Sequence, residues 1–328
     1  PRYRSLAVRW RPDPLVTGII LAMILGLVLR LAQRAHDVFS VVADLSVATV
    51  FVVYGMRIRT RDVLDGLRNA RLQGMVLAAT YVLFPVLGFA IGKAVTPWLG
   101  TGFATGFLYL SLLPSTIQSS VTFVSIARGN VAAAVCAATI SNIAGIFVTP
   151  FLVLAFLHIG GASGEGFLSV FVLLLLPFVL GQLIQPKVGG WWRAHRRLVR
   201  VIDNSSIILI VFSAVLGATA AGAWRGVTVW TILLLLGLSG VLLTLLLAIT
   251  WWLGGLAGLS RADRIVLLMC GSKKSLASGL PMAKALFPAA VVGSVIVPVV
   301  IFHQLQLFVC AILARRLGLT ADPGAVVA

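Results

Sequence analysis

The chain contains 328 residues, of which 60% are hydrophobic and only 11% are charged. Soluble domains are nearer half apolar and a quarter charged, so this composition excludes an ordinary soluble enzyme. The net charge of +17 would suit a nucleic-acid-binding protein, but the basic residues lie in short stretches between apolar runs rather than on one solvated face. We therefore expect the lipid bilayer, and no nucleic acid, as a partner. The three cysteines fall inside apolar runs, which indicates no disulfide framework, and we expect no cofactor and no certain metal site.

Apolar runs of about 20 residues, the length that crosses a bilayer as a helix, follow one another along the chain. Lipid cannot satisfy the open edge of a strand, so these runs predict helices. The first run is too long for a signal peptide and lacks a small-residue cleavage site. The sequence thus predicts an all-α integral membrane protein with ten transmembrane helices. The predicted spans are 14–32, 37–57, 72–95, 101–127, 131–158, 166–186, 201–222, 228–258, 263–286 and 289–314.

The connectors between these spans carry the signals of orientation. The two longest, 57–71 and 187–200, are basic and partly amphipathic, which predicts helices at the membrane surface. Most of the lysines and arginines lie at the N-terminus, in the connectors after the even-numbered spans and at the C-terminus. Because cytoplasmic loops are enriched in these residues, we expect the N- and C-termini in the cytoplasm, the connector near Ala162 outside, and the protein in the cell membrane.

Two sequence matches at nearly the same spacing predict an internal repeat. The Asp-x-Ser run that begins at Asp44 in the second span recurs at Asp203 in the seventh. In the fourth and ninth spans, the segment 116–128 matches the segment 272–284. Each half holds five spans, an odd number, so the two halves enter the membrane from opposite sides as an inverted-topology repeat. The predicted five-helix halves, which together form one membrane domain, are residues 1–160 and 161–328.

The fourth and ninth spans are also the two that carry interrupting residues. In the fourth, a proline opens a polar run; in the ninth, two glycines, a proline and two lysines share one short segment. Proline removes a helix hydrogen bond, and nearby polar groups can satisfy the backbone that it frees. We therefore predict two broken helices, near 114–118 and 271–274, whose breaks pack together at mid-membrane. The residues predicted to interrupt the helices are Pro114, Gly271, Gly279 and Pro281.

The simpler alternative is a pair of proline-kinked helices, but it does not explain Lys273 and Lys274. A lysine near the bilayer centre costs about 3 kcal/mol on insertion scales, so such residues are functional by default. Adjacent residues on a helix point about 100° apart, so one of the two lysines is free to meet Asp44 or Asp203 instead of the site. The repeat pairs Lys274 with Gln118, which favours Lys274 as the residue that faces the site.

Polar residues around the two interruptions form the predicted binding site. The N-termini of half-helices carry positive partial charge and, together with the lysines, favour an anion. The predicted substrate- or ion-binding residues are Ser115, Thr116, Gln118, Ser119, Ser120, Thr139, Ser141, Asn142, Ser272, Lys273, Lys274 and Ser275. Asp44 and Asp203 are expected to support the fold as helix caps or arginine partners. The run His303-Gln304-Leu-Gln306 is expected to join helices by hydrogen bonds and not to carry chemistry.

At several of these segments the sequence resembles the bile acid:sodium symporter family. The family resemblance rests on Gly55-Met-Arg-Ile58, on Ala127-Arg-Gly-Asn-Val-Ala132 and on the polar interruption of the ninth span. The runs Leu112-Leu-Pro-Ser-Thr-Ile-Gln-Ser-Ser120 and Cys270-Gly-Ser-Lys-Lys-Ser-Leu-Ala-Ser-Gly279 resemble more specifically its atypical member-seven branch. The resemblance implies a ten-helix fold with a core domain, in which spans 4 and 9 cross, a panel domain, and a substrate cavity between the two.

The resemblance also implies that the family's sodium sites are degraded in this chain. Positions that hold a glutamate and a glutamine in the ninth span of sodium-coupled members correspond to Cys270 and Lys274. A third ligand position corresponds to Thr80, and two hydroxyl ligands of the fifth span correspond to Ala134 and Ala138, although Thr139, Ser141 and Asn142 lie close by. The fourth-span ligands remain similar in kind as Gln118, Ser119 and Ser120.

The sequence therefore predicts a secondary active transporter, not an enzyme, that moves a small organic and anionic solute by alternating access. We predict that the chain does not use the family's two-sodium coupling. One hypothesis is that a lysine ammonium occupies the vacated sodium space as a tethered cation, whose protonation couples transport to protons; the alternative is a permanently charged lysine that only holds the two interruptions together. Coupling to protons or to sodium stays open. The alternative is a non-transporting membrane regulator of cation, for example calcium, homeostasis. An intramembrane hydrolase that pairs Ser119 with Lys274 is disfavoured because no oxyanion-hole motif or metal-binding cluster accompanies the pair.

Overall fold

The computed structural model describes residues 14–29, 32–57, 69–157, 171–222, 224 and 227–320. All regular structure in this part of the chain is helical, which confirms the all-α class. The helices are α1 (Pro14–Val28), α2 (Gln33–Arg57), α4 (Ala70–Ala78), η2 (Ala79–Leu83), α5 (Phe84–Leu99), α6 (Thr101–Leu112), α7 (Ile117–Ile126), α8 (Val131–Leu157), η3 (Phe171–Leu175), α10 (Leu176–Ala194), α11 (Arg196–Ala220), α12 (Val229–Leu256), α13 (Arg261–Gly271), α14 (Leu276–Leu286) and α15 (Ala289–Leu319).

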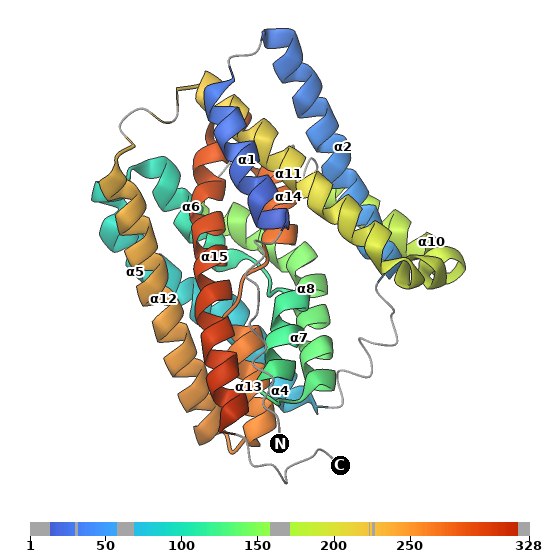
Figure 1. The fold of residues 1–328 in the computed structure, drawn as a ribbon, viewed down its shortest axis with the longest axis vertical. Helices are drawn as coiled ribbons and strands as arrows, with labels where there is room; N and C mark the ends of the chain where they lie inside the picture. The colour runs from blue at the N-terminus through green and yellow to red at the C-terminus, as the bar shows by residue number, and fades with distance from the viewer. Residues whose placement is uncertain are drawn as a thin grey trace, which may run out of the picture.

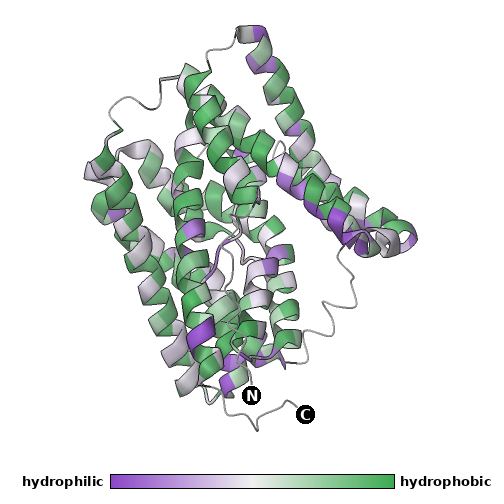
Figure 2. Cartoon of the chain, in the orientation of Figure 1, coloured by the Kyte–Doolittle hydropathy of each residue, from purple (hydrophilic) through white to green (hydrophobic). Residues whose placement is uncertain are grey.

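Six of the described helices are long and apolar enough to cross a membrane on their own. The consecutive pair α6 and α7, bent by 61° at a short break, adds a seventh crossing if it is one span. The other described helices are shorter or more polar: α1 has 15 residues, and α13 carries Arg261, Asp263 and Arg264 in its first turn. The apolar surfaces of most helices are evident in Figure 2, where hydrophilic residues gather near the meeting point of α2, α10 and α11.

Local sequence signals set where several helices begin. The Asn69 side chain accepts from Leu72 N, and the Ser260 side chain accepts from Asp263 N. Thr228 and Thr231 form a capping box at the start of α12, in which each side chain bonds the other's backbone amide. These contacts satisfy backbone amides that the first turn of a helix leaves without partners.

The helices form two packed groups (Figure 1). In the first, which we call the outer group, α2 packs against α10 and α11, and α1 packs against α11. The second, which we call the main group, contains α4 to α8 and α12 to α15. The groups meet where α11 packs against α14 and α15, and where α2 packs against α14. A single hydrophobic cluster runs through this contact and includes Val47, Ile210, Val211, Val292 and Val295.

Glycines allow the closest helix contact inside the outer group. A Cβ atom on Gly55 would collide with the Phe178 carbonyl oxygen, and a Cβ atom on Gly181 would collide with the Val52 carbonyl oxygen. Gln182 adds a hydrogen bond across the same contact, from its Nε2 to the Gly55 oxygen at 2.9 Å. The backbones of α2 and α10 therefore touch at a point that no larger residue would permit, as small residues allow in membrane helix pairs.

The two predicted surface helices have different outcomes. Most of the connector 57–71 lies outside the described residues. The connector 187–200 is not a separate helix: residues 187–194 continue α10, and residues 196–200 form the first turns of α11. The chain turns between these two helical parts at His195, whose φ of −94° and ψ of 51° are not helical. The helical character of this connector is confirmed, and its position at the membrane surface stays a prediction.

Candidate functional site

Both predicted interruptions are present, and they are bonded to each other. Helix α6 ends at Leu112 and α7 begins at Ile117, while α13 ends at Gly271 and α14 begins at Leu276. The backbone amide of Ser275, in the second break, donates to the carbonyl oxygen of Pro114, in the first, at 2.8 Å. We call the two interrupting segments, 113–116 and 272–275, the crossover.

The first break exposes backbone groups that neighbouring side chains then satisfy. The Thr149 hydroxyl donates to the Leu112 oxygen at 2.8 Å, and the Asn142 amide donates to the Ser115 oxygen. The Ser115 backbone amide donates to the Ser141 hydroxyl at 3.1 Å. A helix terminus buried without such partners would leave costly unpaired groups. Polar residues of α8 therefore serve the broken backbone.

Lys274 bonds three of the remaining carbonyl oxygens. Its Nζ donates to the oxygens of Thr80 at 2.9 Å, Ser111 at 2.9 Å and Leu113 at 2.6 Å, which matches the three donors of an ammonium group. The ammonium also lies over the Phe84 ring, 4.1 Å from its centre, and the residue is buried. Lys274 thus joins η2, the end of α6 and the second break in one charged contact.

The carbonyl oxygen of Thr80 is available to Lys274 for a local reason. The η2 turn is a π-helical turn, in which the amide of Phe84 bonds to the Ala79 oxygen instead of the Thr80 oxygen. The next amide that could reach Thr80 would come from residue 85, which is proline and has no N–H. The π-turn and Pro85 together leave an acceptor that the lysine fills.

The end of α13 and the second break are stabilised by side chains from the first break, from α7 and from α15. The Ser115 hydroxyl donates to the Cys270 oxygen at 2.6 Å, and the Ser120 hydroxyl donates to the Met269 oxygen at 3.2 Å. Gln306 bonds both backbone groups of Lys274: its Oε1 accepts from the amide at 2.9 Å, and its Nε2 donates to the carbonyl at 2.8 Å. The backbone at Lys274, which lies outside both helices, is therefore held by a side-chain amide in place of a helix partner.

Lys273 has a different environment, although it is equally buried. Its Nζ donates to one carbonyl oxygen, that of Ser119, at 3.2 Å, and lies 3.9 Å from the centre of the Phe123 ring. Lys273 therefore has one oxygen partner within the described chain where Lys274 has three, although each ammonium has three donors. Of the two lysines, Lys273 is the one with hydrogen-bonding capacity to spare.

Most of the predicted site residues meet at or beside the crossover. Those whose hydrogen bonds lie there are Ser115, Thr116, Ser119, Ser120, Ser141, Asn142, Ser272, Lys273, Lys274 and Ser275. His303 joins them through Gln306, whose Nε2 lies 2.9 Å from its Nδ1. Gln118 lies on an exposed face of α7, and neither Thr139 nor Gln304 contributes a hydrogen bond to the described crossover.

Two of the predicted interrupting residues do not interrupt a helix. Gly279 and Pro281 lie inside α14, which begins only after the N-cap Ser275. Gly279 instead permits close packing, because a Cβ atom there would lie 2.5 Å from the Leu113 Cδ1 atom. Its carbonyl oxygen also accepts from the Tyr109 hydroxyl at 2.6 Å. Gly279 is therefore needed where α14 packs against Leu113 of the first break, and it does not interrupt α14.

The two aspartates bind basic residues outside the crossover. Asp203 Oδ2 lies 3.1 Å from Arg57 Nη1, as expected for an arginine partner. Asp44 Oδ1 lies 3.3 Å from Lys284 Nζ. Of the alternatives open to the second central lysine, a contact with Asp44 or Asp203 is not formed, since Lys273 and Lys274 both bond backbone oxygens.

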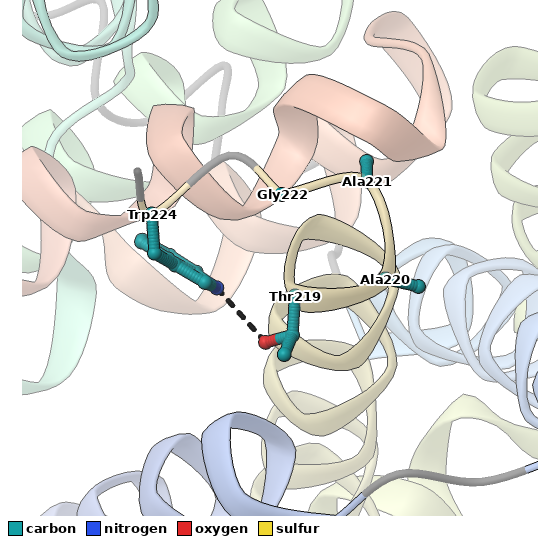
Figure 3. Close-up of a pocket in the computed structure, with 5 residues that line it drawn as sticks. All are labelled: Thr219, Ala220, Ala221, Gly222 and Trp224. Atoms are coloured by element: carbon teal, nitrogen blue, oxygen red, sulfur yellow. Dashed lines mark hydrogen bonds between the residues drawn. The ribbon is translucent and has the colours of Figure 1, made fainter. Parts of the chain in front are cut away.

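An open pocket of about 470 Å³ lies elsewhere, at the C-terminal end of α11 (Figure 3). The residues that line it are Thr219, Ala220, Ala221, Gly222 and Trp224. The Trp224 indole donates to the Thr219 hydroxyl at 2.8 Å, as the dashed line in Figure 3 shows. None of the described residues that line the pocket is charged, and none is a predicted site residue.

Sequence reasoning missed two residues that support the site. Thr149 bonds the oxygen of Leu112, the last residue of α6, and Tyr109 bonds the oxygen of Gly279 in α14. Gln306 belongs to the run that was expected to join helices, and it is the glutamine of that run that bonds the crossover. Nothing local to Thr149 or Tyr109 indicated their role, because their partners lie far away along the chain.

Known proteins of similar sequence are membrane transporters or related proteins that match along nearly the whole chain. The profile of the SBF-like CPA transporter family matches residues 13–318. The protein PA2026 of Pseudomonas aeruginosa is 38% identical over 97% of this chain and 96% of its own length. YfeH of Escherichia coli, a candidate symporter by its name, is 38% identical over 93% of this chain and 92% of its own.

A vertebrate relative is more distant but covers most of both chains. The sodium/bile acid cotransporter 7 of Mus musculus is 26% identical over 83% of this chain and 82% of its own. The resemblance to bile acid:sodium symporters is confirmed, and these matches place the protein among multi-pass membrane transporters and not among enzymes. The chain belongs to the SBF-like CPA transporter family.

Proposed function

We propose that this protein is a secondary active transporter that moves a small organic anion across the cell membrane by alternating access. The observation that carries the proposal is the crossover, where two broken helices are bonded to each other through Ser275 and Pro114. Paired broken helices provide the binding sites of many secondary transporters, since half-helix ends and unwound backbone can meet a solute there.

The same proposal includes ten spans in two inverted five-helix halves. In support, α6 and α7 are the fourth predicted span, α13 and α14 are the ninth, and both are broken. The proposed boundary between residues 160 and 161 and the connector near Ala162 lie outside the described residues. The outer group would be the panel, the main group the core, and both termini would face the cytoplasm.

An anionic solute is favoured by the charges at the crossover. Helix α7 begins there without a side-chain cap, so the amides of its first turn remain as donors with positive partial charge. Lys273 lies against the same turn, through its bond to the Ser119 oxygen. A carboxylate, sulfate or phosphate group is the chemistry that such donors recognise.

Coupling to two sodium ions is disfavoured by the contacts of Lys274. Its ammonium binds three carbonyl oxygens, which are the kind of ligand that sodium would need. The positions aligned with family ligands hold Cys270, Ala134 and Ala138, all of them buried and without oxygen in the side chain. A sodium ion about 4 Å from the ammonium would be repelled by about 4 kcal/mol at an effective dielectric of 20.

Flux into proteoliposomes tests this function. Uptake of a panel of labelled organic carboxylates and sulfates would be measured with sodium replaced by a bulky organic cation, with and without a pH gradient. We expect uptake of at least one anion to persist without sodium and to fall strongly in Lys273→Gln, with empty liposomes as the control. Uptake that vanishes without sodium would overturn the coupling proposal. If no anion crosses although the protein is folded, the non-transporting regulator is favoured.

A further inference from the structure

An ion pair joins the outer group to the main group on one side of the crossover. Lys284 of α14 lies 3.3 Å from Asp44 of α2, and its Nζ donates to the Ser40 hydroxyl at 3.0 Å. The Lys284 side chain is only 9% exposed, so the contact is enclosed although Asp44 is 48% exposed. Because its two partners lie in different groups, this pair must break if the groups separate here.

The packing between the groups is uneven in a way that follows the proposed repeat. The repeat relates α2 to α11, α7 to α14 and α8 to α15. Helices α14 and α15 pack against α11, and α14 also packs against α2. Their counterparts α7 and α8 form no packed pair with α2 or α11 among the described helices, and in Figure 1 their lower ends lie apart from α2 and α10. Helix α8 reaches the outer group only at η3, the turn that continues into α10. Among the described helices, the groups are thus packed more closely on the α14 side than on the α7 side.

The repeat also gives the Asp44–Lys284 pair a counterpart, which is not formed. Asp44 matches Asp203, and Lys284 matches Arg128 at the end of α7. The Arg128 side chain is exposed and has no ion-pair partner in the described chain, and its backbone has a φ of 56°. Asp203 is held by Arg57 through Oδ2, while its Oδ1 atom is buried without a hydrogen-bond partner.

We propose that Asp44–Lys284 and Arg128–Asp203 are two gate pairs that form alternately as the transporter changes the side on which it opens. This inference rests on the proposed function and its inverted repeat. In this structure the first pair is made and closes the α14 side; in the other state it breaks, and Arg128 reaches the free oxygen of Asp203. Arg57 keeps Asp203 paired while the second gate is open, since a partly buried carboxylate without a partner would be costly.

Cross-linking of paired cysteines tests the alternation without a substrate. One variant carries Asp44→Cys with Lys284→Cys, another carries Arg128→Cys with Asp203→Cys, and a third carries all four, each with Cys136→Ser. Treatment of the protein in liposomes with a short bifunctional thiol reagent is expected to link either pair in the third variant, but not both in one molecule. Doubly linked molecules, or a second pair that never links, would overturn the proposal.

Charge reversal adds a test that does not depend on the reagent's reach. Lys284→Glu should raise the cross-linking of the Arg128→Cys/Asp203→Cys pair by about fivefold, because it removes a contact of the closed side. Adding Asp44→Lys should restore the original yield, whereas Arg315→Glu, at another exposed arginine, should leave it unchanged. Size-exclusion profiles report whether each variant is folded, and a yield that Lys284→Glu does not change in folded protein would overturn the gate role.

The two proposals fail separately under these experiments. If the pairs alternate but no anion is taken up, the gate inference stands and the transport function falls. If uptake is measured but both pairs link in the same molecule, transport stands and the alternating gates fall.

Discussion

The Lys274 ammonium takes the place of three backbone donors, so removing it should lower the free energy of unfolding. In Lys274→Met the oxygens of Thr80, Ser111 and Leu113 lose their shared donor inside a buried site. We expect a loss of about 3 kcal/mol in the free energy of unfolding, since each unsatisfied buried acceptor costs about 1–3 kcal/mol. Thermal or denaturant unfolding of the purified protein in detergent measures it.

Lys273→Met is the matched control for this change. The two residues are adjacent, equally buried and of one type, but Lys273 has a single carbonyl partner. We expect Lys273→Met to be clearly more stable than Lys274→Met. Equal losses would contradict the division between a structural and a functional lysine.

The two glutamines of α15 offer a second comparison at the residue scale. Gln306 bonds the amide and the carbonyl of Lys274, whereas Gln304 contributes no hydrogen bond to the described crossover. Gln306→Leu should therefore destabilise the protein by about 2 kcal/mol, because two buried backbone groups lose their partner. Gln304→Leu should change the melting temperature little, and a larger effect at Gln304 would show that the crossover does not depend on Gln306.

The sequence indicated that the polar residues of α15 join helices, but not which one does so. Residues 304 and 306 are separated by about 200° around a helix, so only one of them faces a given neighbour. Which one depends on how α15 packs against the rest of the chain, and no local pattern records that. The same limit applies to Lys274, whose Thr80 acceptor belongs to a distant π-turn.

At the scale of elements, the two breaks were predictable because their causes are local. Pro114 and the Gly271–Lys274 run cannot continue a regular helix without loss of hydrogen bonds or burial of charge. Gly279 and Pro281 were predicted to interrupt the helix for the same reasons, but both lie inside α14. Pro281 is the sixth residue of α14, where it removes one intrahelical hydrogen bond but does not end the helix. The reason for Gly279 is the side chain of Leu113, which only the fold brings near.

The contact between α2 and α10 should depend on the absence of side chains at one point. In Gly181→Val, the added atoms would meet the Val52 oxygen and the Cα of Gly55, both parts of a rigid backbone. We expect a loss of about 3 kcal/mol, the upper range for overpacked sites, or failure to fold. Gly190→Val, where a Cβ meets open space in the same helix, is the control. Expression level and melting temperature decide between them, and equal behaviour of the two variants would contradict this account.

For the whole molecule, the proposed orientation can be tested at two exposed residues. Trp98, at the end of α5, is 71% exposed, and Leu319, at the end of α15, is 86% exposed. In a Cys136→Ser background, Trp98→Cys should react with an impermeant thiol reagent added outside cells, and Leu319→Cys only after the membrane is opened. The parent without either change reports the reactivity of Cys270 and Cys310, and reversed labelling would overturn the orientation and the inverted repeat together.

Membrane class and family followed from the sequence, whereas the number of crossings is only partly shown. Length and composition identify six described helices, or seven with the bent pair, against ten predicted spans. The difference lies partly in the ninth span, which is divided into short helices and begins with the charged residues Asp263 and Arg264. Interrupted and charged spans are hard to recognise by hydropathy because they contain polar residues and short helices. In many secondary transporters these same features form the binding site.

The three hydrogen bonds that hold the Lys274 ammonium have a thermodynamic consequence for the proposed transport cycle. A cation that is covalently part of the chain returns with the empty carrier, so over one cycle it delivers no free energy from any ion gradient. It can offset the charge of a nearby anion on the loaded step, but it carries its own charge back on the empty step, and each charge that crosses moves with or against about 2.3 kcal/mol per 100 mV of membrane potential. A carrier built in this way therefore brings the anion to equilibrium with the membrane potential, unless a second species, bound on one side and released on the other, supplies further work.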